Sequence, residues 1–75
     1  MKYEEAVTEL YYSLFGNHPT NYHSTLYRLI EKADHTNREK LRLAYPDEVS
    51  AWEEWHKSES ESEFFLRRCG LKVPA

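Results

Sequence analysis

The spacing of apolar residues along the chain predicts a series of short helices. Over residues 2–15 apolar side chains recur every three or four positions, as they do on one face of an α-helix. Glu4 and Glu5 would lie in the first turn, where the helix dipole favours negative charge. Gly16 is placed to take the left-handed conformation just past the helix end, and the Asn-His-Pro segment at 17–19 cannot continue the helix. We therefore expect the first helix over residues 2–15.

A second helix is predicted after this first break. Thr20 or Asn21 can supply the side-chain oxygen that caps its N-terminus. Apolar residues again recur at helical spacing, while Arg28 and Lys32 lie toward the C-terminal end, where the dipole favours cations. We expect this helix to end near Asp34.

A third and shorter helix is predicted next. Thr36 precedes Glu39 by three residues, which is the spacing of a capping box and indicates a helix start. Apolar positions continue to Ala44. The dipeptide Tyr45-Pro46 then interrupts the pattern, because the residue before a proline is disfavoured in the helical conformation. The expected length is about two turns.

Two more helices complete the pattern. Pro46 suits the first position of a helix, where its missing N–H is not needed. Residues 58–62 alternate serine with glutamate, and because serines inside a helix compete for backbone hydrogen bonds, we expect a break there. Ser60 and Glu63 form a second capping-box pair that opens the last helix, and Gly70 is placed to end it.

These elements predict an all-α fold: a single small domain over residues 1–75, with four to five short helices and residues 71–75 as a loose tail. A chain of this length buries only about 60% of the surface that its unfolded form exposes. Its eleven aromatic residues can compensate, because each buries a large area. The expected core is Leu10, Leu14, Leu26, Leu29, Ile30, Leu41, Val49, Trp52, Phe65 and Leu66.

The chain has one cysteine, Cys69, so an internal disulfide is impossible. An apolar run long enough for a signal peptide or a membrane span is absent from the sequence. We therefore expect a cytoplasmic protein without contact to a membrane. The helical register of Cys69 beside two apolar residues favours a small buried hydrophobe over a nucleophile.

The sequence does not predict catalytic chemistry, a metal site or a cofactor. Adjacent carboxylates such as Glu53 and Glu54 diverge by about 100° around a helix and so do not share a site. The two glycines are too far apart for a phosphate-binding loop. The four histidines lack the spacing of metal ligands; they are His18, His23, His35 and His56. We expect a protein that is not an enzyme.

An acidic stretch predicts a surface for a basic partner protein. Residues 47–63 hold seven acids against one lysine, and aromatic side chains lie among them. Aromatic side chains can anchor a partner while carboxylates steer its approach. The predicted contact residues are Trp52, Glu53, Glu54, Trp55, Glu59, Glu61 and Phe64. In the alternative interpretation the tryptophans belong to the core and the acids only solvate the outer face.

A basic stretch offers a second hypothesis, a dimeric DNA-binding regulator. The turn between the second and third helices resembles the edge of a helix-turn-helix unit, and its cations could meet a phosphate backbone. These residues are Arg28, Lys32, Arg38, Lys40 and Arg42. A net charge of −3 argues against general binding of nucleic acid. A third hypothesis is a structural component that self-associates, as a homodimer or within a larger assembly.

Four segments of the chain resemble small uncharacterised open reading frames of bacteriophages and prophages. These segments are Leu-Ile-Glu-Lys-Ala-Asp at 29–34, Asn-Arg-Glu-Lys-Leu at 37–41, Tyr-Pro-Asp-Glu-Val at 45–49 and Ala-Trp at 51–52. The stretch from residue 29 to residue 52, in which these segments lie, is about a third of the chain. The resemblance implies a phage or mobile-element accessory protein, which would work in the host cytoplasm. Inhibition of a host defence enzyme or a nucleic-acid-binding enzyme would fit, because an acidic surface can occupy a DNA-binding groove.

Overall fold

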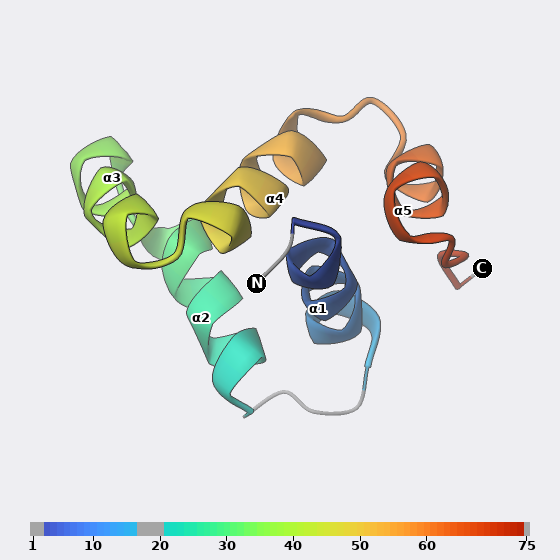
Figure 1. Cartoon of the computed structure of the whole chain (residues 1–75), viewed down its shortest axis with the longest axis horizontal. Helices are drawn as coiled ribbons and strands as arrows, with labels where there is room; N and C mark the ends of the chain where they lie inside the picture. Colours follow the sequence, from blue (N-terminus) through green and yellow to red (C-terminus); the bar gives the residue numbers. More distant parts are fainter. Residues whose placement is uncertain (1–2, 17–20, 75) are drawn as a thin grey trace.

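The computed structural model describes residues 3–16 and 21–74, and over these residues the protein is built from helices alone (Figure 1). The prediction of an all-α fold with four to five short helices is confirmed. The helices are α1 (Tyr3–Phe15), α2 (Tyr22–Lys32), α3 (His35–Ala44), α4 (Pro46–Lys57) and α5 (Glu61–Cys69). Within the described part of the chain, none of these helices is both long and apolar enough to cross a membrane.

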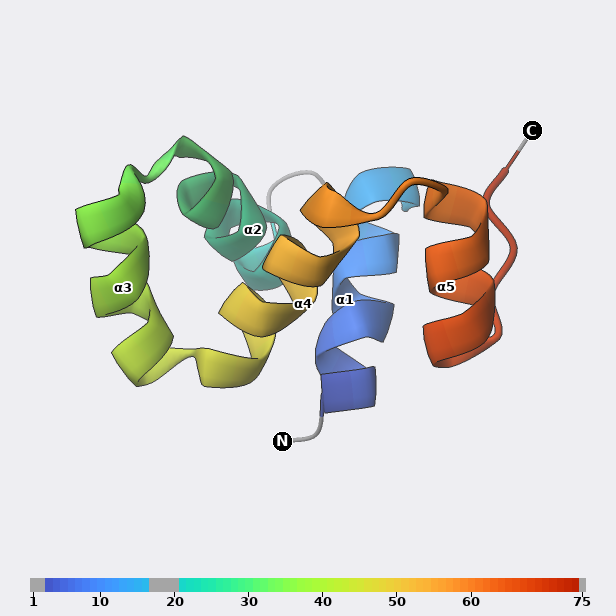
Figure 2. The same ribbon diagram turned by 90° about the horizontal axis from the view of Figure 1, so that it is seen from above.

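Helix α1 is the centre of the arrangement. It packs against α2, α4 and α5, so three of the other four helices rest on it. Figure 2 shows α3 and α5 at opposite ends of the molecule, with α4 and α2 next to α1 between them. Helix α3 contacts the rest of the fold mainly through α4. The molecule is therefore an irregular cluster of helices around α1.

The core lies where α1, α2, α4 and α5 meet. Phe65 is fully buried, and the rings of Tyr11, Phe15 and Phe64 lie 5.2–6.0 Å from its own. On the α2 side the buried Tyr27 hydroxyl donates a hydrogen bond of 2.7 Å to the carbonyl of Ala6. The buried residues are Ala6, Val7, Leu10, Leu26, Tyr27, Ile30, Val49, Ala51, Trp52, Phe64 and Phe65. Aromatic side chains thus supply much of the core of this short chain, as their number predicted.

The predicted core is wrong at three leucines. Leu14 is 39% exposed, Leu29 52% and Leu66 54%. Neighbouring helices therefore cover each of these side chains only in part. Leu41 is partly buried against the core, and the remaining predicted core residues are buried. The apolar stripe on these helices is therefore wider than the face that the fold covers.

Side-chain caps begin three of the helices. Of the two candidates for α2, Asn21 makes the capping bond, accepting from the backbone N–H of Ser24 at 2.8 Å. Ser60 accepts from the N–H of Glu63 at 3.2 Å and begins α5, as predicted. The prediction for α3 is wrong, because the cap is Asp34, which accepts from the N–H of Asn37 at 2.8 Å.

This earlier cap also changes the length of α3. Thr36 lies inside the first turn, and the helix has ten residues, nearly three turns rather than two. Only Ala33 and Asp34 separate α2 from α3. Pro46 takes the first position of α4, as predicted.

The two glycines end their helices in different ways. Gly70 has φ 72° and ψ 15°, the left-handed conformation predicted for it. Gly16 does not take a positive φ, so the same prediction is wrong there. A Cβ at Gly16 would lie 2.4 Å from the carbonyl oxygen of Tyr12. Glycine is required at position 16 because the Tyr12 carbonyl leaves no space for a Cβ, and not because the backbone there is left-handed.

The C-terminal segment is held more closely than a loose tail. Residues 71–74 have no regular structure, but the Tyr11 hydroxyl donates a hydrogen bond to the carbonyl of Lys72 and Val73 packs against the core. The sequence predictions for Lys2, for residues 17–19, for capping by Thr20 and for Ala75 lie outside the described residues.

Candidate functional site

Two of the aromatic residues predicted to anchor a partner belong to the core. Trp52 is 5% exposed and Phe64 7% exposed, so the interpretation of these two side chains as exposed anchors is wrong. The guanidinium carbon of Arg38 lies 4.5 Å from the centre of the Trp52 ring, and the His56 ring stacks 4.7 Å from it. The indole therefore supports the fold instead of facing a partner.

Most of the acids beside them also have partners within the chain. The Trp55 Nε1 donates to Glu61 at 3.0 Å. Glu53 pairs with Arg42 at 2.6 Å, and Glu54 accepts a hydrogen bond from the Tyr3 hydroxyl. Ion pairs and hydrogen bonds made inside the chain satisfy these carboxylates. They are less available to a basic partner than the sequence indicated.

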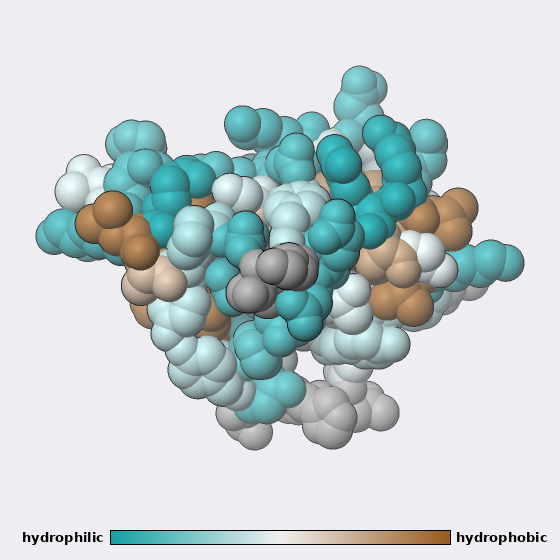
Figure 3. All heavy atoms as spheres, in the orientation of Figure 1, coloured by the Kyte–Doolittle hydropathy of each residue, from teal (hydrophilic) through white to brown (hydrophobic). Residues whose placement is uncertain are grey.

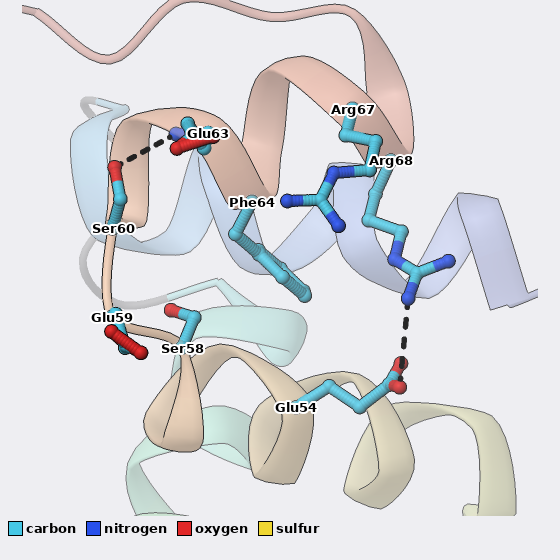
Figure 4. A pocket seen from close by; sticks show the side chains of 8 residues that line it. All are labelled: Glu54, Ser58, Glu59, Ser60, Glu63, Phe64, Arg67 and Arg68. Carbon is cyan, nitrogen blue, oxygen red and sulfur yellow. Dashed lines mark hydrogen bonds and ion pairs between the residues drawn. The ribbon is translucent and has the colours of Figure 1, made fainter.

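Helices α4 and α5 enclose an open hollow of about 400 Å³ on this acidic side (Figure 4). Arg68 reaches down to Glu54 at 3.7 Å, and Arg67, from the same helix, also lines the hollow. The hollow is lined by Glu54, Ser58, Glu59, Ser60, Glu63, Phe64, Arg67 and Arg68. Charges of both signs line it, so its electrostatics select neither a cation nor an anion.

The five predicted nucleic-acid contacts separate into two groups. Arg38 donates to the carbonyls of Ile30 at 3.2 Å and Ala33 at 2.6 Å, and so closes the C-terminus of α2. Arg42 pairs with Glu39 as well as Glu53, and these hydrogen bonds raise its pKa. Both guanidinium groups thus have their partners within the chain.

The remaining three predicted contacts, Arg28, Lys32 and Lys40, lie at the surface. Three exposed cations are few for a duplex-binding surface, because affinity for a duplex grows with the number of phosphates that Lys and Arg neutralise. The arrangement of charges weakens the DNA-binding hypothesis.

A groove between α2 and α3 has the composition of an interaction surface. It has a volume of about 520 Å³ and is lined by Leu29, Lys32, Ala33, Asp34, Asn37, Lys40 and Leu41. Half of the Leu29 side chain is exposed there, and Leu43, on the outer side of α3, is 88% exposed. Apolar side chains with cations at the edge favour contact with another protein over contact with a small charged ligand.

Sequence reasoning missed the groove as a site because it assigned Leu29 and Leu41 to the core. One signal was present: Leu29 directly precedes Ile30, and adjacent helical residues point about 100° apart. Both can be buried only if neighbours cover a wide sector of α2. The structure buries Ile30 and leaves Leu29 at the groove.

Figure 3 shows how hydrophobic and hydrophilic residues are distributed on one face of the molecule. Hydrophobic residues gather over the two ends, at α3 and at α5, and hydrophilic residues cover the middle. The exposed leucines on these helices are Leu43 on α3 and Leu66 on α5. The two ends therefore provide matched positions for comparing surface variants.

A small polar cluster joins α1 to α2 and α4. His23 Nε2 lies 2.9 Å from one carboxylate oxygen of Glu9, while the other oxygen is buried without a hydrogen-bond partner among the described residues. Burial raises the pKa of Glu9, nearby His23 acts in the opposite direction, and the charges of Glu48 and Glu5 raise it further. Glu48 is itself 8% exposed.

Over residues 3–16 and 21–74, histidine, cysteine and acidic side chains do not gather in groups of three or more that could hold a metal ion. His23 pairs with Glu9, and His56 stacks on Trp52. His35 is exposed at the start of α3, and His18 lies outside the described residues. Cys69 is half-buried, with its thiol 3.3 Å from the carbonyl of Phe65.

Comparison of the chain with protein-family models, with curated proteins and with solved structures found no match.

Proposed function

We propose that this chain is a protein-interaction module that presents α3 and its adjoining groove to a partner protein. One observation carries the proposal: α3 holds no buried residue. Every other helix buries at least two side chains. A helix that adds so little to the core is free to contribute its surface to a partner.

The energetics of a short helix support this proposal. Fixing the backbone of each residue costs about 1–2 kcal/mol, and helices in small proteins usually offset this by burying an apolar face. Helix α3 buries only part of Leu41. Polar contacts hold it instead: the Asp34 cap, the carbonyl bonds of Arg38 and the ion pairs of Arg42. The outer face is thereby kept in a fixed position, which lowers the entropy lost on binding.

The proposed setting is that of a phage or prophage accessory protein, which the sequence resemblance implies. In that setting the partner is a host protein, and binding blocks or redirects its activity. This proposal keeps the interaction module expected from the sequence and moves its surface from the acidic 47–63 stretch to α3.

Two matched leucine variants test the proposal. Leu43→Ser changes the exposed leucine on α3, and Leu66→Ser makes the same change on α5. Both should leave the thermal midpoint almost unchanged, because exposed side chains contribute little to stability. Each tagged chain is used to capture proteins from its natural cellular background, and the protein retained by wild type is purified and titrated.

We expect Leu43→Ser to weaken binding of the purified partner by roughly tenfold, the effect of removing one apolar contact near an interface centre. Leu66→Ser should bind it like the wild type. Equal affinity of the wild type and Leu43→Ser would show that α3 is not the binding surface. Loss of binding only in Leu66→Ser would transfer the function to the opposite end of the molecule.

A further inference from the structure

The groove between α2 and α3 has an apolar floor and two short helical walls. The last turns of α2 and the first turns of α3 form the walls, and the two-residue linker fixes their separation. Leu29 and Ala33 come from the α2 side and Leu41 from α3. Arg38 ties both walls together, because its guanidinium donates to two carbonyls at the end of α2. The groove is therefore part of the folded framework.

Two lysines and one acid, Asp34, line the groove, so the lining has an excess of one positive charge. Lys32 and Lys40 line it from opposite walls, and neither ammonium group has an ion-pair partner among the described residues. The acids beside them are engaged: Asp34 caps α3, and Glu39 pairs with Arg42, which lowers the pKa of Glu39. A negatively charged partner would thus meet two available cations.

From this combination we infer that the groove binds one amphipathic helix of a partner protein, with apolar side chains on the floor and carboxylates toward Lys32 and Lys40. An apolar floor with charged side chains at its edges suits helix-in-groove recognition, in which an amphipathic helix lays its apolar face on the groove. A ten-residue helix such as α3 is about 15 Å long, so the matching segment would span about ten residues. The inference rests on the proposed function and names the chemistry of its partner.

Designed peptides can test this chemistry without knowledge of the natural partner. The probe is a fluorescein-labelled amphipathic helix of about fifteen residues, with leucines on one face and glutamates along its edges. The matched peptide carries lysine in place of every glutamate. Fluorescence anisotropy measures the binding of both peptides to the full chain at low and at moderate salt.

We expect the glutamate peptide to bind at least tenfold more tightly than the lysine peptide, with a preference that weakens as salt is raised. The double variant Lys32→Glu/Lys40→Glu should reverse the preference. Leu29→Ser should weaken both peptides by roughly fivefold, because it removes part of the apolar floor. Lys72→Glu, which changes an exposed lysine in the C-terminal segment, is the matched control and should bind like the wild type.

Several results would overturn the inference. Equal binding of the glutamate peptide to the wild type and to the Lys32→Glu/Lys40→Glu variant, or binding to neither, contradicts it. Binding of a DNA duplex in place of the peptide would assign the lysines to phosphate contacts. Concentration-dependent dimers that Leu29→Ser abolishes would assign the groove to a second copy of the chain. Circular dichroism confirms that each variant is folded.

Failure of this inference is distinguishable from failure of the proposed function. If the peptides do not bind but Leu43→Ser still loses the captured partner, α3 is the interaction surface and the groove is not its recognition site. If Leu43→Ser retains that partner, the proposed function fails whatever the peptides do.

Discussion

Glu9 brings an ionisable group into the contact between α1 and α2. One of its oxygens meets His23, and the other is buried without a hydrogen bond among the described residues. Burial raises the pKa of Glu9 above 4.5, because a carboxylate loses hydration in the interface. The ionised form is therefore less favourable in the folded chain than in the unfolded chain.

The raised pKa of Glu9 predicts that the stability of the fold depends on pH. A group whose pKa is raised by folding contributes stability that is fully present below the unfolded pKa and lost as pH rises through the folded pKa. Relative to Glu9→Gln, the wild type should lose stability as the pH rises from below 4.5 through the raised pKa of Glu9, and the loss should be small because part of the side chain is exposed. Urea unfolding of both proteins across this range measures the difference.

His23, Glu48 and Glu5 remain in both proteins, but their charges act on a Glu9 carboxylate only in the wild type, so the measured difference includes these interactions as well as burial. The opposite slope, with the wild type gaining on the variant as pH rises, would mean that attraction to His23 outweighs the burial of the carboxylate.

The leucines show that burial of a single residue is only partly predictable from the sequence. Leu10 and Leu26 were predicted to be buried and are, whereas Leu29 and Leu66 have the same chemistry and are exposed. Periodicity identifies which side of a helix is apolar. It does not reveal how much of that side its neighbours cover, which depends on packing between distant segments. The groove escaped prediction for this reason.

At the scale of the elements, capping decides where α3 begins. Asp34→Ala removes the side-chain oxygen that accepts from the N–H of Asn37 and should destabilise the helix by about 1 kcal/mol. Because α3 buries no residue, the loss should appear as local fraying. Hydrogen exchange of the α3 amides should accelerate several-fold, while exchange in α1 stays nearly constant.

Thr36→Ala is the control, since Thr36 is two positions beyond the cap and should matter little. A larger effect for Thr36→Ala than for Asp34→Ala would restore Thr36 as the cap of α3.

Local chemistry made most element boundaries predictable. The caps at Asn21, Ser60 and Gly70 depend on contacts within one turn of the chain, so the sequence contains all their information. The boundary of α3 was misplaced because Asp34 and Thr36 are both good capping residues only two positions apart. Choosing between them requires the path of the chain after α2, which contacts with Arg38 help to fix.

The whole molecule depends on a few aromatic side chains. Phe65 is fully buried and in contact with rings from α1 and α5. Phe65→Ala should cost about 3–5 kcal/mol, a large part of the roughly 4–11 kcal/mol expected for a chain of this length. We expect the variant to be largely unfolded at 37 °C in thermal and urea denaturation.

The neighbouring Leu66→Ala should cost less than about 1 kcal/mol, because its side chain is half exposed. Similar losses for the two variants would place the centre of the core elsewhere. The position of Phe65 at that centre could be predicted from the sequence, but its partners Tyr11 and Phe15 could not, since they come from the other end of the chain.

The central position of α1 also has a consequence for how the chain folds. Helix α1 is synthesised before α4 and α5, which later pack on it, so until then only α2 can cover part of its apolar face. Helices can form within microseconds, whereas contacts between distant segments must first close long loops. Although the helices are short and local, the core can close only after α5 has been synthesised, because Phe64 and Phe65 belong to it.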